Sequence, residues 1–265
     1  MTAMRPLPWG RSPLIGTVLT LPGAVSAELF SEPLDVVWVD LEHGALGRAD
    51  AQEMILGAQA TGTLALVRVA IADAAGLVGP MLDAGADGIV AADVRNPEQA
   101  EWLASLTQHP PDGRRGYGPR RSMLRGRMQG ERRDRTGLWM QIESQEGVAA
   151  VEAIGHTRGL DALVVGIADL CIDLGIPIGL GDPRLLDALQ AISFAADQAG
   201  VRFGLAGPLH PVEQLGGLLD AVSVLVHSTD ARLCAATVDS LATSLRERVR
   251  GPVPVSAYAR GEGRA

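Results

Sequence analysis

Residues 36–46 read VVWVDLEHGAL, a stretch that begins with apolar residues and then places Asp40, Glu42 and His43 within four positions of one another. Continuous hydrophobicity is typical of a strand that is covered on both faces, as in a parallel sheet. Charged groups are costly to bury unless they are paired or bound to a metal. The stretch therefore predicts a buried parallel strand whose end delivers ionisable side chains to an opening of the fold.

Seven further apolar runs follow the same pattern, with stretches of helical spacing between them. The eight predicted strands cover residues 14–20, 35–41, 64–70, 88–93, 138–144, 161–167, 202–207 and 221–227. Strands that alternate with helices pair in parallel, and eight such units in 265 residues favour a TIM (β/α)8 barrel of the α/β class over an open doubly wound sheet. We expect a single barrel domain over residues 1–250 and a flexible tail over residues 251–265.

Local signals mark several helix boundaries. Asn96 followed by Pro97 predicts a capped helix start, and His210–Asp220 repeats the pattern of a proline at the first helical position. The segment DAGADG, residues 83–88, places glycine where a helix ends. These signals place helices after the third, fourth and seventh predicted strands.

Composition limits the partners of the chain. Its formal net charge is −8, which gives no general attraction to nucleic acid or anionic membranes, and no apolar run approaches the roughly 18 residues of a membrane span. Cys171 and Cys234 lie far apart and suggest neither a zinc site nor a disulfide framework, so we expect both in the core. We expect a cytoplasmic protein with no nucleic-acid or membrane partner. The alternative is a secretory signal, which Arg5, Arg11 and the apolar residues 13–27 resemble.

All 23 basic residues are arginine, and the chain contains no lysine. This excludes Schiff-base chemistry, pyridoxal phosphate attachment and the lysine of a phosphate-binding P-loop. Negative charge that develops during carbonyl chemistry must be stabilised in another way, and a metal ion is the direct alternative. Nine arginines lie in residues 110–137, which we interpret as a long loop that handles an anionic substrate and contacts other subunits rather than as a nucleic-acid patch.

Polar side chains recur at the carboxyl ends of the predicted strands, where barrel enzymes build their active sites. Arg68 ends the third strand, Gln141 and Glu143 end the fifth, and Asp169 follows the sixth. Glu143 and Asp169 on neighbouring strands are suited to hold one hard divalent cation and to leave positions open for water and substrate. The alternatives are that these two carboxylates cap helices or pair with arginines, and that Arg68 pairs with the acidic residues that end the second strand.

Six motifs occur in order along roughly residues 14–240, namely VDLEHG, VRV, MLDAGADGIV, RRGYG, QIESQEGV and GIADL. Their order and spacing resemble those of the HpcH/HpaI aldolase family of class II pyruvate-dependent aldolases. The resemblance implies a TIM barrel and a homohexamer built as a trimer of dimers. It also implies a divalent cation, Mg²⁺, Mn²⁺ or Co²⁺, held by Glu143 and Asp169 beside Gln141, which neighbours the substrate.

The same match, residue by residue, implies roles for the other motif residues. His43 corresponds to the catalytic base, and Arg68 corresponds to the residue that faces the enolate and keto oxygen. Asp83 corresponds to the partner of the histidine, contributed across a subunit interface. Ala168 and Asp169 belong to the substrate site, where the GIADL segment offers backbone N–H groups to the pyruvate carboxylate if it opens a helix.

The function implied by the resemblance is a metal-dependent lyase that reversibly cleaves a 4-hydroxy-2-oxoacid to pyruvate and an aldehyde through a metal-stabilised enolate. A metal and a fixed arginine charge stabilise an enolate without lysine, and histidine is suited to accept the proton of the 4-hydroxyl. Two alternatives stay open: a citrate-lyase-β-like acyl-CoA lyase of the same superfamily, and a non-catalytic oxoacid-binding barrel. Ala92, Ile167 and His227 depart from the family pattern near the substrate end, which leaves the aldehyde specificity undetermined.

The candidate residues also have simpler interpretations. His43 taken alone is a rim histidine, and Asp83 taken alone is the last residue of a helix with no further role. Asp40 and Glu42 are expected to orient other groups rather than to bind a metal. The remaining histidines are expected to be structural or exposed, and they are His109, His156, His210 and His227.

Overall fold

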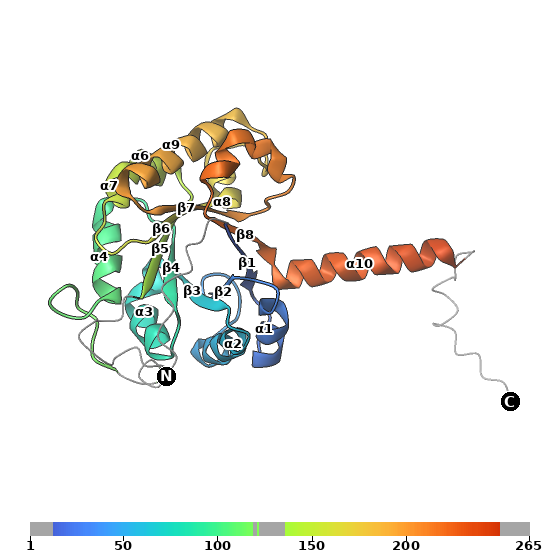
Figure 1. Ribbon diagram of the computed structural model, residues 1–265, viewed down its shortest axis with the longest axis horizontal. Coiled ribbons are helices and arrows are strands. Elements are labelled where there is room, and N and C mark those ends of the chain that lie inside the picture. Colours follow the sequence, from blue (N-terminus) through green and yellow to red (C-terminus); the bar gives the residue numbers. More distant parts are fainter. Residues whose placement is uncertain (1–12, 119–120, 122–135, 250–265) are drawn as a thin grey trace. The chain divides into compact units, whose positions relative to one another are not determined.

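The computed structural model describes residues 13–118, 121 and 136–249. Eight parallel strands close into a barrel in which each strand pairs with the next along the chain and the last pairs with the first (Figure 1). The strands are β1 Leu14–Leu19, β2 Val36–Asp40, β3 Leu64–Ala70, β4 Gly88–Ala92, β5 Gly137–Ile142, β6 Ala162–Gly166, β7 Arg202–Gly207 and β8 Val224–Thr229. The structure therefore confirms the (β/α)8 barrel predicted from the eight apolar runs.

The chain divides into two compact units, Met1–Asp230 and Ala231–Ala265. The first unit contains the barrel, and the second contains most of helix α10, Asp230–Arg248. The tail predicted at residues 251–265 lies outside the described residues. In the part of the chain that the structure describes, no helix is both long and apolar enough to cross a membrane.

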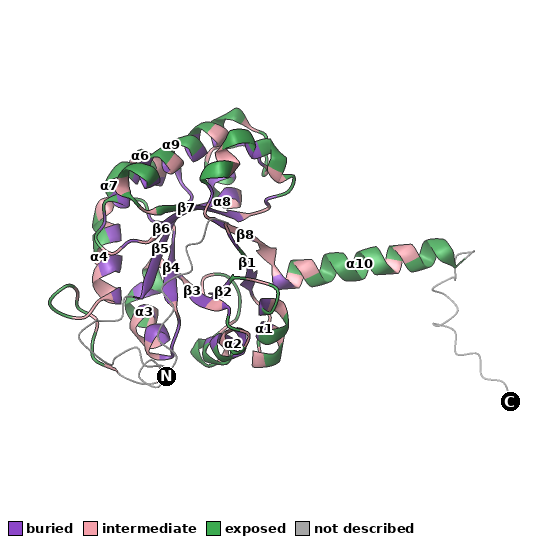
Figure 2. Ribbon diagram, in the orientation of Figure 1, coloured by how far each residue is buried: buried purple, intermediate pink, exposed green. Residues whose placement is uncertain are grey.

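Helical elements follow the strands of the barrel unit and lie around its outer surface (Figure 1). They are α1 Ala24–Ser31, α2 Arg48–Ala60, η1 Ile71–Asp73, α3 Ala74–Asp83, α4 Pro97–Thr107, α6 Gln145–Ala149, α7 Val151–Gly155, α8 Ile167–Asp173, α9 Pro183–Ala199 and η2 Val212–Ala221. Figure 2 shows that the strands are buried and that the helices expose one side to solvent. Both faces of the strands are therefore covered, as the unbroken apolar runs predict.

The sequence signals for helix boundaries are confirmed in two places. The side-chain oxygen of Asn96 caps α4 by accepting a hydrogen bond of 3.0 Å from the N–H of Gln99, and Pro97 is the first helical residue. Gly85 follows the end of α3 with a φ of 99°, a left-handed conformation that glycine adopts without strain.

The segment before the last strand differs from its prediction. Pro211 lies at the cap of η2 rather than inside a helix, and η2 is a 3-10 element that Gly216 interrupts with a φ of 53°. Because η2 continues to Ala221, the last strand starts at Val224 and ends at Thr229, later than the predicted residues 221–227.

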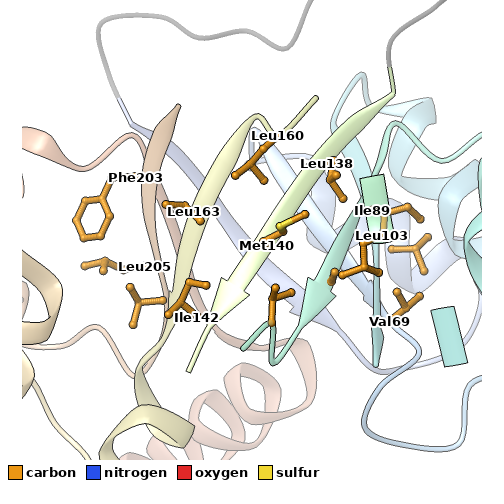
Figure 3. Close-up of a cluster of buried hydrophobic side chains, with 14 of the residues drawn as sticks. Val69, Ile89, Leu103, Leu138, Met140, Ile142, Leu160, Leu163, Phe203 and Leu205 are labelled. Carbon is orange, nitrogen blue, oxygen red and sulfur yellow. The ribbon is translucent and has the colours of Figure 1, made fainter. Parts of the chain in front are cut away.

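The strand side chains form two apolar layers, because successive residues of a strand point to opposite faces. Val36 and Trp38 of β2 face the barrel interior, where the ring of Trp38 meets that of Trp139 edge-on with centroids 6.1 Å apart. The outward residues pack against the helices, and Figure 3 shows part of this layer, with Met140 and Leu163 on neighbouring strands. Two tryptophans thus fill the interior of a barrel that is otherwise lined by small and aliphatic side chains.

This alternation also decides which polar side chains enter the barrel mouth. In β2, β3 and β5, the last apolar residue that faces the barrel interior is followed two positions later by a polar residue. These polar residues are Asp40, Arg68 and Gln141. Side chains two positions apart share a face of a strand. All three therefore point toward the barrel axis at the carboxyl ends of their strands.

Candidate active site

Asp40 and Arg68 form a buried ion pair at the ends of two adjacent strands. They are opposite one another in the pairing of β2 with β3. Arg68 donates from Nε to Oδ1 of Asp40 at 3.0 Å and from Nη2 to Oδ2 at 2.7 Å, and the Asp40 side chain is only 2% exposed. Two nitrogen atoms of the guanidinium thus bind the two carboxylate oxygens, and this bidentate contact fixes the orientation of the guanidinium.

The same carboxylate organises the loop that follows β2. Oδ1 of Asp40 accepts hydrogen bonds from the backbone N–H groups of Glu42 at 3.1 Å and of His43 at 3.3 Å. Burial works to lower the pKa of Arg68, but the hydrogen bond and the charge of Asp40 outweigh it and raise that pKa above its ordinary value. The arginine is therefore permanently cationic, and Asp40 orients it, as the sequence predicted for this residue.

Glu143 follows β5 and is buried, with 7% of its surface exposed. Its Oε2 atom accepts a hydrogen bond from Nε2 of Gln141. Burial, followed by the negative charges of Glu42 and Asp169, raises the pKa of Glu143 to about 8. Burial also raises the pKa of Glu42, although the charge of Arg68 opposes that shift. Carboxylates crowded into a dry site hold their negative charge poorly unless a cation compensates it.

Gly166 makes room for this arrangement. A Cβ atom at residue 166 would collide with the carboxylate of Glu143 and the amide of Gln141. Gly166 ends β6 and immediately precedes α8, so the helix that carries Asp169 in its first turn starts beside Glu143. Sequence reasoning did not single out Gly166; its signal was a glycine between an apolar run and the acidic IADL segment.

Several buried acceptor atoms in this region lack a hydrogen-bond donor among the described residues. They are Oε2 of Glu42, Oε1 of Gln141 and Oδ1 of Asp93. Arg68 lies 3.2 Å from Oε2 of Glu42, an ion-pair contact without hydrogen-bond geometry. Unpaired buried acceptors are destabilising, and oxygen ligands are the ones that hard divalent cations prefer. The side chains present therefore fit a divalent cation.

The protein supplies only part of a coordination shell. Across the described residues, no group of three or more histidine, cysteine or acidic side chains has an arrangement that would hold a metal ion. A divalent cation held by Glu143 and Asp169, the predicted pair, would need further oxygen ligands from water or a substrate.

His43 stands at the edge of the mouth, with 67% of its side chain exposed. Its Nε2 atom is 3.7 Å from Oε2 of Glu42, and its backbone is held by Asp40. His43 is therefore held through its backbone while its ring is open to solvent.

Asp83 lies far from His43 in this chain. Asp83 is the last residue of α3, shortly before β4 begins. It therefore lies at the amino-terminal end of the barrel strands, opposite the mouth. There it accepts a 2.7 Å hydrogen bond from Nη2 of Arg115, whose side chain is 8% exposed. Arg115 belongs to the arginine-rich segment 110–137, most of which lies outside the described residues. Contact between Asp83 and a histidine base would therefore require a second subunit, and this role of Asp83 stays a prediction.

The other histidines hydrogen-bond to or from backbone groups or lie at the surface. His109 and His156 contact the carbonyl oxygens of Arg115 and Glu152 through Nδ1, at 3.0 and 2.8 Å. Nδ1 of His227 accepts a hydrogen bond of 3.2 Å from the N–H of a residue in the loop after β7. Cys171 is buried as expected, but the expectation for Cys234 was wrong, because this residue is exposed on α10, a helix that buries few of its side chains.

A surface cavity of about 620 Å³ lies apart from the barrel mouth. It is lined by the carboxyl-terminal parts of α4 and α7 and by the loops that follow them, including His156 and Arg158. None of the predicted site residues lines it. The chemistry is therefore assigned to the carboxyl ends of the strands and not to this cavity.

Comparison with known proteins identifies relatives of this barrel. The family model for HpcH/HpaI aldolase/citrate lyase matches residues 22–225. A hydroxypyruvate/pyruvate aldolase of Rhizorhabdus wittichii is 32% identical over 202 residues, which cover 74% of this chain and 79% of the relative. A 4-hydroxy-4-methyl-2-oxoglutarate aldolase of Hapsidospora irregularis is 32% identical over 180 residues, 65% of this chain and 67% of the relative. The crystal structure of an HpcH/HpaI aldolase/citrate lyase family protein from Burkholderia cenocepacia superposes with a TM-score of 0.80, at 29% identity, over 91% of this chain and 97% of that chain.

The barrel, its mouth and these relatives define a carbon–carbon lyase of the aldolase type. The family match covers well over half of the chain. The chain belongs to the HpcH/HpaI aldolase/citrate lyase family, which confirms the resemblance of its six motifs. Members of this family generally depend on a divalent metal.

Proposed function

We propose that this protein is a class II aldolase that reversibly cleaves a 4-hydroxy-2-oxoacid to pyruvate and an aldehyde. The observation that carries the proposal is that the Asp40–Arg68 ion pair and the buried carboxyl of Glu143 lie at the same end of the barrel strands, where burial raises the pKa of Glu143 to about 8. The names of the relatives support the substrate class, because three relatives at 32–33% identity are hydroxypyruvate/pyruvate or 4-hydroxy-4-methyl-2-oxoglutarate aldolases.

Glu143 and Asp169 would hold the divalent cation, with Mg²⁺, Mn²⁺ and Co²⁺ as the candidates. When bound, the cation supplies electrostatic stabilisation to the negative charge that develops on the keto oxygen. Gln141 keeps the Glu143 carboxylate in place through its hydrogen bond. Ala168 lies in the first turn of α8, where its backbone N–H is suited to bind the carboxylate of pyruvate.

Arg68 supplies a second, fixed positive charge to the same oxygen. Asp40 occupies the edge of the guanidinium formed by Nε and Nη2. The Nη1 group is therefore the part of Arg68 that meets a substrate oxygen. Because Asp40 holds the fork in place beforehand, little reorganisation accompanies the reaction.

His43 is assigned as the base that accepts the proton of the 4-hydroxyl group in the cleavage direction. Its exposed ring lies beside the mouth, and Glu42 is close enough to stabilise the protonated imidazole. As cleavage proceeds, the electron pair of the carbon–carbon bond passes to the enolate and the hydroxyl carbon becomes the aldehyde carbonyl. Asp83 of another subunit is the proposed partner of this histidine.

A homo-oligomer, with a hexamer as the arrangement implied by the sequence, is part of the proposal. The position of Asp83 supports it, since Asp83 and His43 lie at opposite ends of the barrel. Helix α10 adds support, because its apolar residues Val238, Leu241 and Leu245 share one side of the helix and are 54–65% exposed. Free thiols at both cysteines support a cytoplasmic location.

The test is pyruvate consumption by the purified protein with Mn²⁺ and a panel of small aldehydes, with and without EDTA. We expect turnover that EDTA abolishes and that His43→Ala reduces by at least about 100-fold, the contribution typical of a general base. Turnover with acyl-CoA esters alone would replace the aldolase by a citrate-lyase-like reaction. Pyruvate binding without turnover of any aldehyde would indicate a non-catalytic barrel.

A further inference from the structure

Asp93 is in an unusual backbone conformation directly after β4. Its φ of 52° is positive, and the only other positive φ outside glycine among the described residues belongs to Ser228. The following residue is locked to the neighbouring strand, because the N–H of Val94 donates to the carbonyl of Gln141 at 3.1 Å. A left-handed conformation is strained for a residue with a side chain, and such strain persists where the surroundings impose it, often at functional sites.

The two oxygens of the Asp93 carboxylate have different surroundings. Oδ2 accepts from Nε of Arg95 at 2.8 Å and lies 2.7 Å from its Nη2. Oδ1 is buried and has no hydrogen-bond donor among the described residues. Burying a charged acceptor without a donor is unfavourable. Asp93 therefore presents an unsatisfied acceptor in a strained loop of the barrel mouth.

Asp93 directly follows β4, at the same carboxyl end of the strands as Asp40, Arg68 and Gln141. After burial and the charges of closer groups, its charge is a lesser cause of the raised pKa of Glu143, so the two carboxylates are within electrostatic reach. The neighbouring positions on the mouth carry small side chains, since Ala70 and Ala92 are opposite one another in the pairing of β3 with β4.

Arg95 does not make this region an anion site. Its guanidinium is already engaged by Asp93 and lies 3.8 Å from Glu146. Glu42 and Asp169 are further acidic groups of the mouth, close enough for their charges to raise the pKa of Glu143. An aldehyde that carries its own carboxylate would meet repulsion here, whereas a neutral hydroxyl group would meet an acceptor.

We propose that Asp93 is a specificity-determining residue that accepts a hydrogen bond from a hydroxyl group of the aldehyde half of the substrate. The inference rests on the proposed aldolase function and narrows its aldehyde to hydroxylated, uncharged ones. A donor from the substrate satisfies Oδ1, and a site with a buried acceptor discriminates against an analogue that lacks the hydroxyl.

The experiment compares glycolaldehyde with acetaldehyde, which differ by one hydroxyl group, as acceptors for pyruvate in the presence of Mn²⁺. We expect the wild-type kcat/KM to be about 10- to 100-fold higher for glycolaldehyde, the range of a hydrogen bond to a charged group. In Asp93→Ala the glycolaldehyde value should fall more than the acetaldehyde value and bring the ratio to within about threefold of one. Asp93→Asn, which keeps an oxygen acceptor, should give an intermediate ratio.

Glu146→Ala is the matched control, because it removes an exposed acidic side chain that contacts Arg95 and leaves the Asp93–Arg95 pair in place. Its ratio should equal that of the wild type. Asp93→Gly guards against a folding defect, since glycine relieves the positive φ and should raise the melting temperature while abolishing the preference. Equal kcat/KM for both aldehydes in the wild type, or an unchanged ratio in the three Asp93 variants, would overturn the inference while leaving the aldolase intact. Inactivity of the wild type with every aldehyde would overturn the proposed function and this inference with it.

Discussion

Glu143 shows how a single buried carboxylate links stability to metal binding. With its pKa raised to about 8 by burial and by neighbouring negative charges, its side chain is protonated near neutral pH in the metal-free protein. A divalent cation requires the ionised form, so binding displaces the proton. Glu143 is therefore protonated in the metal-free protein and would be ionised in the protein with a bound cation.

A pH titration of stability tests this linkage. Between about pH 4.5 and 8 the folded protein retains a proton on Glu143 that the unfolded chain has lost. The metal-free protein should therefore lose stability as pH rises through this window, by up to about 1.4 kcal/mol per pH unit. Thermal melts in EDTA from pH 5 to 9 measure the slope, and Glu143→Gln, neutral throughout, should flatten it. Part of the slope should remain, because burial also raises the pKa of Glu42.

Added Mn²⁺ should reverse the trend in the wild type and have little effect on Glu143→Gln. Equal slopes in the wild type and the variant would show that Glu143 is ionised in the metal-free protein and would remove the electrostatic argument for a cation at this position.

At the scale of elements, the junction of β6 with α8 provides space for side chains of the barrel mouth and places Asp169 in the first turn of its helix. The strand ends at Gly166 and the helix begins at the next residue, so no loop separates the barrel from Asp169. The absence of a side chain at residue 166 leaves the volume that Glu143 and Gln141 occupy. A short connection thus brings groups from two strands together.

Gly166→Ala tests this junction. The added methyl group should push the Glu143 carboxylate aside, lower the affinity for Mn²⁺ by about 10- to 100-fold and reduce turnover similarly. Gly76→Ala is the matched control, because a Cβ atom at Gly76 in α3 meets no atom within 4 Å and alanine favours a helix. Isothermal titration with Mn²⁺ and assays at saturating metal separate the two effects. Equal Mn²⁺ affinity in Gly166→Ala and the wild type would show that residue 166 does not position the carboxylate.

At the scale of the whole molecule, two features are incomplete within one chain. Asp83, predicted to contact a catalytic histidine across a subunit interface, is paired with Arg115 of its own chain at the amino-terminal end of the strands. Helix α10 exposes Val238, Leu241 and Leu245 along one side. Apolar residues in such a row are typical of a surface that contacts another protein.

Placing charges on this row should weaken assembly. We expect Leu241→Asp combined with Leu245→Asp to shift the protein to a smaller oligomer, measured by light scattering after gel filtration. Ser240→Asp, an exposed polar position of the same helix, is the control and should keep the wild-type mass. If assembly brings Asp83 to the active site, the double variant should also lose turnover. An unchanged mass in the double variant would exclude α10 from the oligomer interface.

Much of the fold could be predicted because the responsible forces are local or periodic. Each strand has five to seven residues and is mostly apolar, and the cap at Asn96 depends on residues three positions apart. The segment before β8 was harder to predict, because Gly216 interrupts it with a positive φ and it forms a 3-10 element, so β8 starts and ends later than predicted. The candidate site was predictable as a set of strand ends but not as a set of contacts.

The amino-acid sequence by itself determined the barrel, the family and the identity of the polar residues at the strand ends. These features depend on apolar periodicity and on the order of motifs, which are properties of the linear chain. What only the tertiary structure decided is which of those residues meet within the chain: Asp40 with Arg68, Gln141 with Glu143, and Asp83 with Arg115. The reason is physical, since contacts between distant residues depend on strand register and helix length. The lack of a donor for Oδ1 of Asp93 among the described residues likewise depends on the tertiary structure.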